Sequence, residues 1–406
     1  MRILCTVTGS QGHAREVLPL AVAFTRAGHD VLVVTAPELA DVFRAAALPV
    51  RAELPGIVES ISALIRARKA AEQDGGAELP ELSIRDQLLR TAAGPHLTAI
   101  YRIVLPIAEE FRPDAVVRDG AELAGMLVAE TLGIPHFSAP SGAGNIIDPM
   151  GLVEPLAERR AELGLPPDDD QRVLHRFGRF ESVPPEYSFA GYDLPGPFAY
   201  RQPLQVGGND ALAPEFAELS GDRPLVLAAV GTALPMLGAF QQYGVDLPES
   251  ATPPEVIMRA LIEGLSEVDC DAVVATAGFS VDGISVGKNI LLRDWVPQPT
   301  VLQCAELFLT HAGYNSVREG IRTATPMVTL PQFGDQMHNA DRITRFGLGE
   351  RLAELSGECV FKTCTAVLAD ERIAAESRRA HRRMLTLPPV DAAVDYVAEL
   401  VDSPRN

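Results

Sequence analysis

The chain has 406 residues, 47% of them hydrophobic, which is enough for two domains of ordinary size. Its 54 acidic residues outnumber 35 basic ones, giving a net charge of -19, so we expect no nucleic-acid partner, because such proteins present a basic face. No signal-peptide pattern precedes the first strand, and no apolar run approaches the roughly 20 residues that span a membrane, so we expect a cytoplasmic protein with no membrane partner.

The chain opens with alternating strand and helix patterns. Residues 3–7 form an apolar run rich in β-formers, a glycine-containing loop follows, and residues 17–27 have helical spacing. An apolar strand at 31–34 comes next, and the same unit recurs as a strand at 115–117 followed by a helix at 121–132. This alternation predicts an α/β fold with a parallel sheet covered by helices.

A second series begins after a Pro- and Gly-rich boundary near 203–223. We predict an N-terminal domain over 1–205, a C-terminal domain over 223–386, and a terminal helix within 387–406 that packs back towards the first domain. Ligands of such sheets bind beyond the carboxyl ends of the strands, so the loops after Val7, Val117, Val230 and Thr310 are the candidate sites. The strands predicted in this half are 225–230, 272–276, 290–292, 307–310 and 327–330.

The strongest functional pattern is the segment 310–320, which follows an apolar strand and opens a helix. Gly313 allows a phosphate to approach the backbone, and Asn315 and Ser316 offer N–H groups where the helix dipole is positive. His311 can donate from its ring, and Glu319 can accept hydrogen bonds from ribose hydroxyls. The structural alternative is a simple turn in which Asn315 and Ser316 cap the helix.

Two flanking motifs favour a functional interpretation of this segment. In order, the chain carries W-x-P-Q from Trp295, H-x-G-x-N-S-x-x-E from His311 and P-x-x-x-D-Q-x-x-N-A from Pro331. This ordered set resembles the family 1 glycosyltransferases, especially bacterial enzymes that decorate natural products. The resemblance implies the GT-B fold, in which two doubly wound Rossmann-like domains face a central cleft.

The resemblance also implies roles for individual residues. The loop with Trp295, Val296 and Gln298 would pack against the nucleobase, although core packing is an equal alternative for Trp295. Asp335 and Gln336 would bind the hydroxyls of the donor sugar, and Glu319 would bind ribose. The diphosphate would be held by His311, Gly313, Ser316 and the pair Gly231-Thr232, although that pair can equally be a strand-ending turn.

A second candidate centre is His13, in the glycine loop at the start of the first helix. Its ordinary pKa suits a general base, although an isolated histidine there more often only bonds backbone. In relatives, this histidine deprotonates the acceptor hydroxyl and an aspartate orients it. Asp119, just after the strand at 115–117, is the expected partner. Asp114 lies at the wrong end of that strand, and Glu122 is a weaker rival.

Other features favour plain structural interpretations. The acidic run 168–170 matches a D-x-D metal motif, but it does not follow a strand and looks like a solvated helix start. His29 and His338 lack ligand spacing, and the five cysteines do too, so we expect no metal and no cofactor. The irregular stretches 56–82 and 140–155 are the expected acceptor contacts, and 234–254 is a candidate lid.

Taken together, the residues predict an inverting glycosyltransferase that moves a sugar, expected to be a deoxyhexose on thymidine diphosphate, to a hydroxyl of a small natural-product acceptor. Two alternatives remain open: a nucleotide-sugar epimerase, and a non-catalytic nucleotide-sugar-binding protein. A homodimer is a further possibility that the sequence leaves open.

Overall fold

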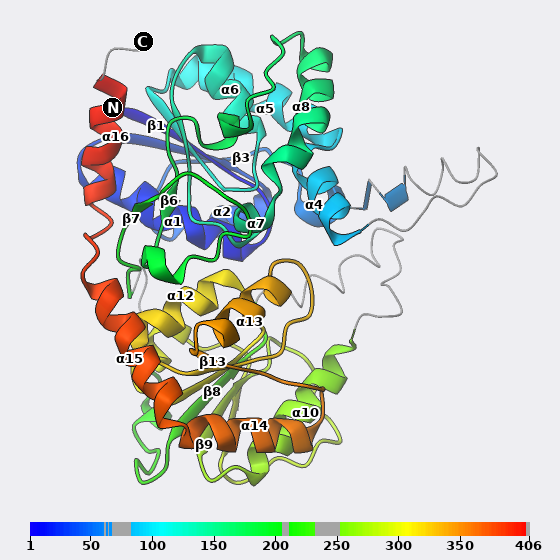
Figure 1. The fold of residues 1–406 in the computed structure, drawn as a ribbon, viewed down its shortest axis with the longest axis vertical. Helices are drawn as coiled ribbons and strands as arrows, with labels where there is room; N and C mark the ends of the chain where they lie inside the picture. The colour runs from blue at the N-terminus through cyan, green and yellow to red at the C-terminus, as the bar shows by residue number, and fades with distance from the viewer. Residues whose placement is uncertain (61, 64, 67–82, 205–210, 232–251, 403–406) are drawn as a thin grey trace, which may run out of the picture.

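The computed structural model describes residues 1–60, 62–63, 65–66, 83–204, 211–231 and 252–402. Two parallel sheets form the centres of its two halves (Figure 1). The first has the order β3-β2-β1-β4-β5, and the second has the order β10-β9-β8-β11-β12-β13. The predicted α/β class with two doubly wound sheets is therefore confirmed.

The strands and helices follow the apolar patterns of the sequence closely. The first sheet contains β1 (Arg2–Val7), β2 (Asp30–Thr35), β3 (Val50–Ala52), β4 (Ala115–Arg118) and β5 (His136–Ser138). The second contains β8 (Leu225–Ala229), β9 (Asp271–Ala275), β10 (Ile290–Arg293), β11 (Leu307–Thr310), β12 (Met327–Thr329) and β13 (Gly349–Arg351), and a small third sheet pairs β6 (Phe180–Glu181) with β7 (Phe198–Ala199).

The helices cover both faces of each large sheet. In the N-terminal half they are α1 (Gln11–Arg26), α2 (Ala40–Arg44), α4 (Ile84–Ala93), α5 (His96–Phe111), α6 (Ala124–Leu132), α7 (Gly142–Ile146) and α8 (Pro149–Leu163). The rest are α10 (Pro254–Glu267), α11 (Gln298–Val301), α12 (Tyr314–Thr323), α13 (Gln336–Arg345), α14 (Gly357–Ala369), α15 (Glu371–Leu385) and α16 (Ala392–Asp402). Short 3₁₀ turns lie at Pro37–Leu39, Gln171–His175, Pro185–Tyr187 and Pro214–Phe216.

Alternating side chains of the central strands supply the cores on the two faces. Ile3, Cys5 and Val7 of β1 pack in the cluster with α1, whereas Leu4 packs in the opposite cluster with α5 and α6. Strands buried on both faces carry nearly continuous apolar runs, as the sequence shows for β1. The second sheet repeats this arrangement, with α10 and α14 on one face and α12, α13 and α15 on the other.

The strand orders place two switch points at predictable positions. The chain direction across the first sheet reverses between β1 and β4, and across the second it reverses between β8 and β11. Ligands of doubly wound sheets bind outside the carboxyl ends of such strand pairs. The loops predicted as site loops, after residues 7, 117, 230 and 310, are the loops of these two switch points.

The C-terminal helix crosses from the second half to the first. Ala393, Val394 and Val397 of α16 are buried in the core that contains α1, and Figure 1 shows α15 and α16 running along one side of both halves. Tyr396 stacks on Phe198 with ring centroids 4.7 Å apart. This packing agrees with the expected return of the terminal helix, while the exact boundaries at 205 and 223 stay a prediction, since 205–210 lie outside the described residues.

Some expectations about individual segments were wrong. The first helix begins at Gln11 rather than 17, and the stretch 140–155, expected to be irregular, contains α7 and the start of α8. Ser141 and Asp148 accept backbone hydrogen bonds at the starts of these two helices, which explains their formation. Within 56–82, residues 57–60 are helical and 67–82 are outside the described residues.

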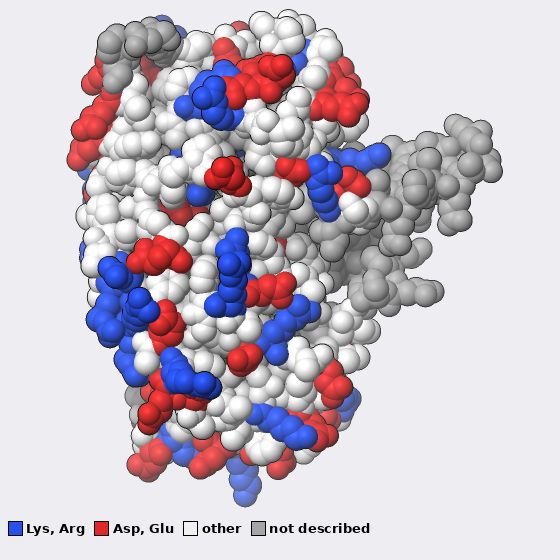
Figure 2. Space-filling view, viewed as in Figure 1, with Lys and Arg blue, Asp and Glu red and all other residues white. Residues whose placement is uncertain are grey.

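The charged surface is mixed in sign. Figure 2 shows acidic and basic side chains interspersed over the visible face, with no continuous basic stripe among the described residues of this view. Among the described helices, none is long and apolar enough to cross a membrane.

Candidate functional site

His13 and Asp119 form a hydrogen-bonded pair at the first switch point. His13 lies in the first turn of α1, and its Nδ1 is 2.8 Å from Asp119 Oδ2, just beyond β4. The Asp119 side chain is 1% exposed, whereas the His13 side chain is 25% exposed. A buried carboxylate therefore holds one ring nitrogen of a histidine that solvent, and hence a ligand, can reach.

Asp119 is itself fixed by its neighbours, and its rivals point elsewhere. Its Oδ1 accepts hydrogen bonds from Ser141 Oγ at 3.2 Å and from the Ala121 N–H at 3.3 Å. Asp114 accepts from the backbone of Arg2, at the amino end of the sheet. Glu122 accepts from Thr6 and from two backbone N–H groups of its own helix start. The structure thus places Asp119, and neither rival, beside His13.

The electrostatics of His13 favour the protonated ring. Burial lowers the pKa of His13, but the Asp119 carboxylate, Glu16 and Asp335 oppose burial and raise this pKa to about 10. Resting His13 is therefore an imidazolium at neutral pH, and the neutral form is a strong base.

His311 occupies the second switch point in a different environment. It follows β11 and is 8% exposed. A Cβ atom on either Gly231 or Gly313 would collide with its ring, so these glycines allow the ring to lie flat against the backbone. Gly231 also has a φ of +76°, in the left-handed region. Burial lowers the pKa of His311 to about 4, and a hydrogen bond with the Ala229 backbone opposes this fall, so the ring is neutral at physiological pH, with one donor and one acceptor nitrogen.

The N-terminus of α12 lies beside His311 and lacks a side-chain cap. Its N-cap is Gly313, so the alternative in which Asn315 and Ser316 cap the helix is wrong. Backbone N–H groups of its first turn can face an anion there. The Asn315 side chain does not face the donor site: its Nδ2 donates to Gly12 O at 2.8 Å, and its Oδ1 accepts from Arg318. The Asn315 side chain is therefore bonded within the protein, and its predicted donor-binding role falls to its backbone N–H.

Gln298 connects the loop 295–298, predicted to contact the nucleobase, to the segment 311–319, predicted to hold the diphosphate and ribose. Its Nε2 donates to Glu319 Oε2 at 2.6 Å and to Ser316 Oγ at 3.2 Å. Burial raises the pKa of Glu319, and this bond from Gln298 opposes the rise. Val296 is buried, whereas Trp295 is 61% exposed, so the core-packing interpretation of Trp295 is wrong. The indole is free to meet a ligand.

Asp335 and Gln336 begin α13 at the boundary between the two halves. Gln336 Oε1 accepts from the Gln332 and Phe333 N–H groups, at 2.8 and 3.3 Å, so it braces the preceding loop. Asp335 Oδ2 accepts from Asn339 Nδ2 at 2.7 Å. Burial raises the pKa of Asp335, with His13 opposing that rise from the other half.

The two halves meet at the candidate site. A Cβ atom on Gly142 of α7 would collide with the Asp335 carboxylate, and the bond from Asn315 to Gly12 joins α12 to the loop that carries His13. The His13–Asp119 pair and the predicted donor loops therefore lie on facing surfaces of the two halves. Thr232 and residues 234–251 of the candidate lid at 234–254 lie outside the described residues.

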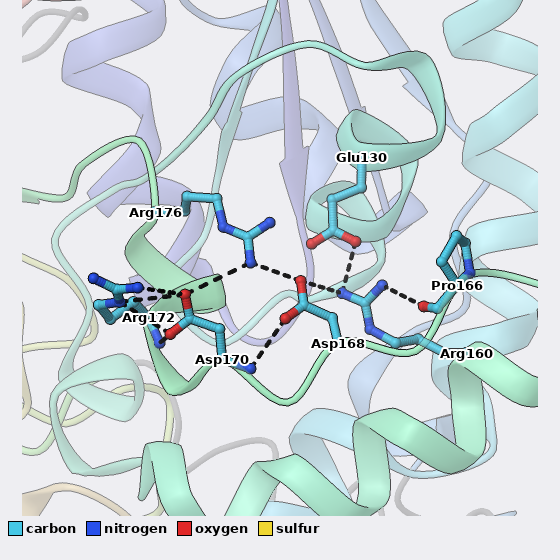
Figure 3. A network of polar contacts seen from close by, with 7 residues as sticks. All are labelled: Glu130, Arg160, Pro166, Asp168, Asp170, Arg172 and Arg176. Atoms are coloured by element: carbon cyan, nitrogen blue, oxygen red, sulfur yellow. Dashed lines mark hydrogen bonds and ion pairs between the residues drawn. The ribbon is translucent and has the colours of Figure 1, made fainter. Parts of the chain in front are cut away.

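The acidic run 168–170 has a structural role. Asp170 caps the 3₁₀ turn that follows and pairs with Arg172, and Asp168 accepts from Arg176 at 2.6 Å and lies 3.9 Å from Arg160 (Figure 3). The expected helix start is confirmed, although the Asp168 side chain is only 20% exposed, since arginines surround it. Asp168 and Asp170 are thus paired with arginines, which favours the structural interpretation of this run.

The remaining histidines also have structural partners. His29 Nδ1 lies 3.0 Å from the N-terminal amine of Met1, and His338 Nε2 lies 2.8 Å from Phe189 O. Among the described residues, the group whose ligand atoms lie within 4.8 Å of one another is His13, Glu16 and Asp119. The absence of a metal requirement stays a prediction.

Three residues of the site were missed by sequence reasoning. Ser141 holds Asp119, and the fully buried Arg318 donates to Ser182 at 2.7 Å and to Asn315. Glu16 is 4% exposed and lies near His13. Glu16 was detectable, because it follows His13 by three residues on one helix face; Ser141 and Arg318 act through tertiary contacts that no local pattern reveals.

Two family models match different halves of the chain. Residues 22–153 match the N-terminal domain of Erythromycin biosynthesis protein CIII-like, and residues 280–401 match UDP-glucoronosyl and UDP-glucosyl transferase. Among curated proteins, the chain is 27% identical over 325 residues to the oleandomycin glycosyltransferase of Streptomyces antibioticus, covering 77% of this chain and 74% of that protein. It is 26% identical to the elloramycin glycosyltransferase ElmGT of Streptomyces olivaceus, covering 97% and 96%.

Solved structures agree on the fold. The glycosyltransferase SsfS6 of Streptomyces sp. SF2575, complexed with thymidine diphosphate, superposes with a TM-score of 0.72 at 22% identity, covering 98% of this chain and 99% of that one. SnogD from Streptomyces nogalater gives a TM-score of 0.73 at 19% identity, covering 99% of each chain. The chain is therefore a glycosyltransferase with the GT-B fold, and it is similar to bacterial glycosyltransferases named for antibiotics.

Proposed function

We propose that the chain transfers a deoxyhexose from a thymidine diphosphate donor to a hydroxyl of a small natural-product acceptor, with inversion at the anomeric carbon. The names of its relatives support an antibiotic-like acceptor. Two similar structures, SsfS6 and VinC, were solved with thymidine diphosphate, which supports the donor class. The proposal rests above all on the 2.8 Å His13–Asp119 pair, whose loop contacts α12 of the other half through the bond from Asn315 to Gly12.

In the proposed reaction, His13 takes the proton from the acceptor hydroxyl as its oxygen attacks the anomeric carbon. The bond from that carbon to the diphosphate oxygen breaks in the same step, so the configuration inverts. Asp119 stabilises the imidazolium that forms and keeps the ring oriented. The products are the glycoside, the nucleoside diphosphate and the proton on His13.

In this proposal, neutral donors meet the charge on the leaving diphosphate. These donors are His311, Ser316 and the N-terminus of α12, which has no side-chain cap and whose helix dipole favours an anion. We propose that this arrangement replaces a metal ion in neutralising the leaving group.

A thermal-shift assay with thymidine and uridine diphosphates, in EDTA, tests the donor assignment. We expect stabilisation of both wild type and His13→Ala, greater with thymidine diphosphate, because binding to the folded state alone adds stability. No shift with either nucleotide at millimolar concentration would contradict the donor site. Anomeric coupling in the product NMR spectrum tests inversion, and an altered nucleotide sugar formed without any acceptor would identify an epimerase instead.

A further inference from the structure

Glu16 is a buried carboxylate that the proposed reaction leaves without a task. It lies one helical turn after His13 on α1, and it is 4% exposed. Its Oε2 is buried with no hydrogen-bond partner among the described residues. A carboxylate loses several kcal/mol of solvation on burial unless a charge or donor compensates for it. Glu16 must therefore be held by the charges around it.

The charges around Glu16 come from four separate elements. His13 lies on its own helix, Arg318 on α12, Asp119 after β4 and Asp335 before α13. Burial raises the pKa of Glu16 to about 8, and His13 and then Arg318 oppose that rise, His13 being the stronger. The buried hydroxyl of Tyr200, after β7, also lies within electrostatic range. Glu16 thus interacts with His13 more strongly than with any other charge.

The distances place Glu16 and Asp119 on the same imidazole. Ligand atoms of His13, Glu16 and Asp119 all lie within 4.8 Å of one another, and Asp119 alone makes the direct bond at 2.8 Å. We propose that Glu16 is a second carboxylate partner of His13, which together with Asp119 sets how strongly the imidazole holds the proton taken from the acceptor. This positioning role rests on the proposed function of His13 as the base.

The two carboxylates therefore act on His13 in different ways. Asp119 fixes the ring by a hydrogen bond, whereas Glu16 acts through its charge. Glu16 is ionised above about pH 8, which covers the range in which His13 loses its proton. An opposite charge within about 4–6 Å raises the pKa of an imidazole by roughly one unit or more, because it favours the protonated ring. Removing that charge makes His13 a weaker base without releasing it from Asp119.

The test measures the titration of His13 directly. The protein is labelled at histidine Cε1, and the His13 signal is assigned among 8 histidines by its loss in His13→Gln. In Glu16→Gln we expect the His13 midpoint to fall by roughly one pH unit or more, and the acid limb of kcat/KM to move with it. Glu16→Asp, which keeps the charge, should restore most of the shift. The midpoint of thermal unfolding should stay close to that of the wild type, because Gln has nearly the same shape as Glu and Glu16 Oε2 has no hydrogen bond to lose among the described residues.

Glu122→Gln is the matched control, since Glu122 is equally buried but bonds Thr6 and backbone N–H groups. The inference would be overturned if the NMR titration midpoint of His13 were unchanged in Glu16→Gln. It would also be overturned if that midpoint shifted equally in Glu122→Gln. If the NMR midpoint moves while the limb of kcat/KM stays, the coupling of Glu16 to His13 holds, and the assignment of His13 as the base is what fails.

Discussion

His13 and His311 occupy equivalent places in the two halves, yet their chemistry is opposite. Each follows a strand at its sheet's switch point and lies where a helix begins. His13 is bonded to a carboxylate, which overcomes burial and raises its pKa to about 10. His311 lies against two glycines, and burial lowers its pKa to about 4. Gly9 lies against the His13 ring in the same way, so it is the bond to a carboxylate that makes one ring a base and leaves the other a neutral donor.

The largest expected effect is the loss of the base. His13→Ala should lower kcat by about 10²–10⁴-fold, the usual contribution of general acid–base catalysis. Affinity for thymidine diphosphate should stay within about twofold, because the proposed binding groups, His311 and the start of α12, lie in the other half. Steady-state kinetics and calorimetry measure the two quantities. A variant that loses nucleotide affinity and turnover together would break the distinction between the two histidines.

The second effect is a change of pH dependence. His13 must be neutral to act, so kcat/KM should rise about tenfold per pH unit until the pH reaches about 10. Asp119→Asn removes the carboxylate that does most to raise the pKa of His13 and leaves burial, which lowers it. The rising limb of the kcat/KM profile should therefore move to lower pH. The value of kcat should fall, because the ring loses its orienting partner. Profiles of both proteins between pH 6 and about 10 test this, and a limb that stays in place would contradict it.

The sequence predicted most of this contrast, for physical reasons. Both histidines follow apolar strands, and the parallel α/β pattern puts such loops at one edge of each sheet, so His13, Asp119 and His311 could be located in advance. The partner bond of Asn315 to Gly12 could not, because it joins residues 303 positions apart. Exposure of Trp295 was equally hidden, since a single aromatic beside apolar residues suits a core or a surface.

A third effect tests the close packing of His311. Gly313→Ala would place a Cβ against the His311 ring and force the ring or the loop to move. Overpacking of this kind typically costs about 1–3 kcal/mol, so we expect affinity for thymidine diphosphate to fall about tenfold. The pH limb of kcat/KM should stay where it is, because His13 is untouched. Gly221→Ala is a useful control for added bulk, since a Cβ there meets no atom within 4 Å; its φ of +71° predicts some loss of stability but none of affinity.

The smallest effect concerns Trp295, the single tryptophan of the chain. Because its side chain is 61% exposed, Trp295→Leu should change the free energy of unfolding by no more than about 0.5 kcal/mol. If the indole stacks on the nucleobase, affinity should fall roughly two- to tenfold, since aromatic pairs contribute about 0.5–1.5 kcal/mol beyond their buried area.

The fluorescence of Trp295 reports this contact directly, because no other tryptophan contributes. Thymidine diphosphate should change the emission of wild type and of His13→Ala alike. Binding detected by calorimetry without any change in emission would place the nucleobase away from Trp295 and contradict the predicted stacking.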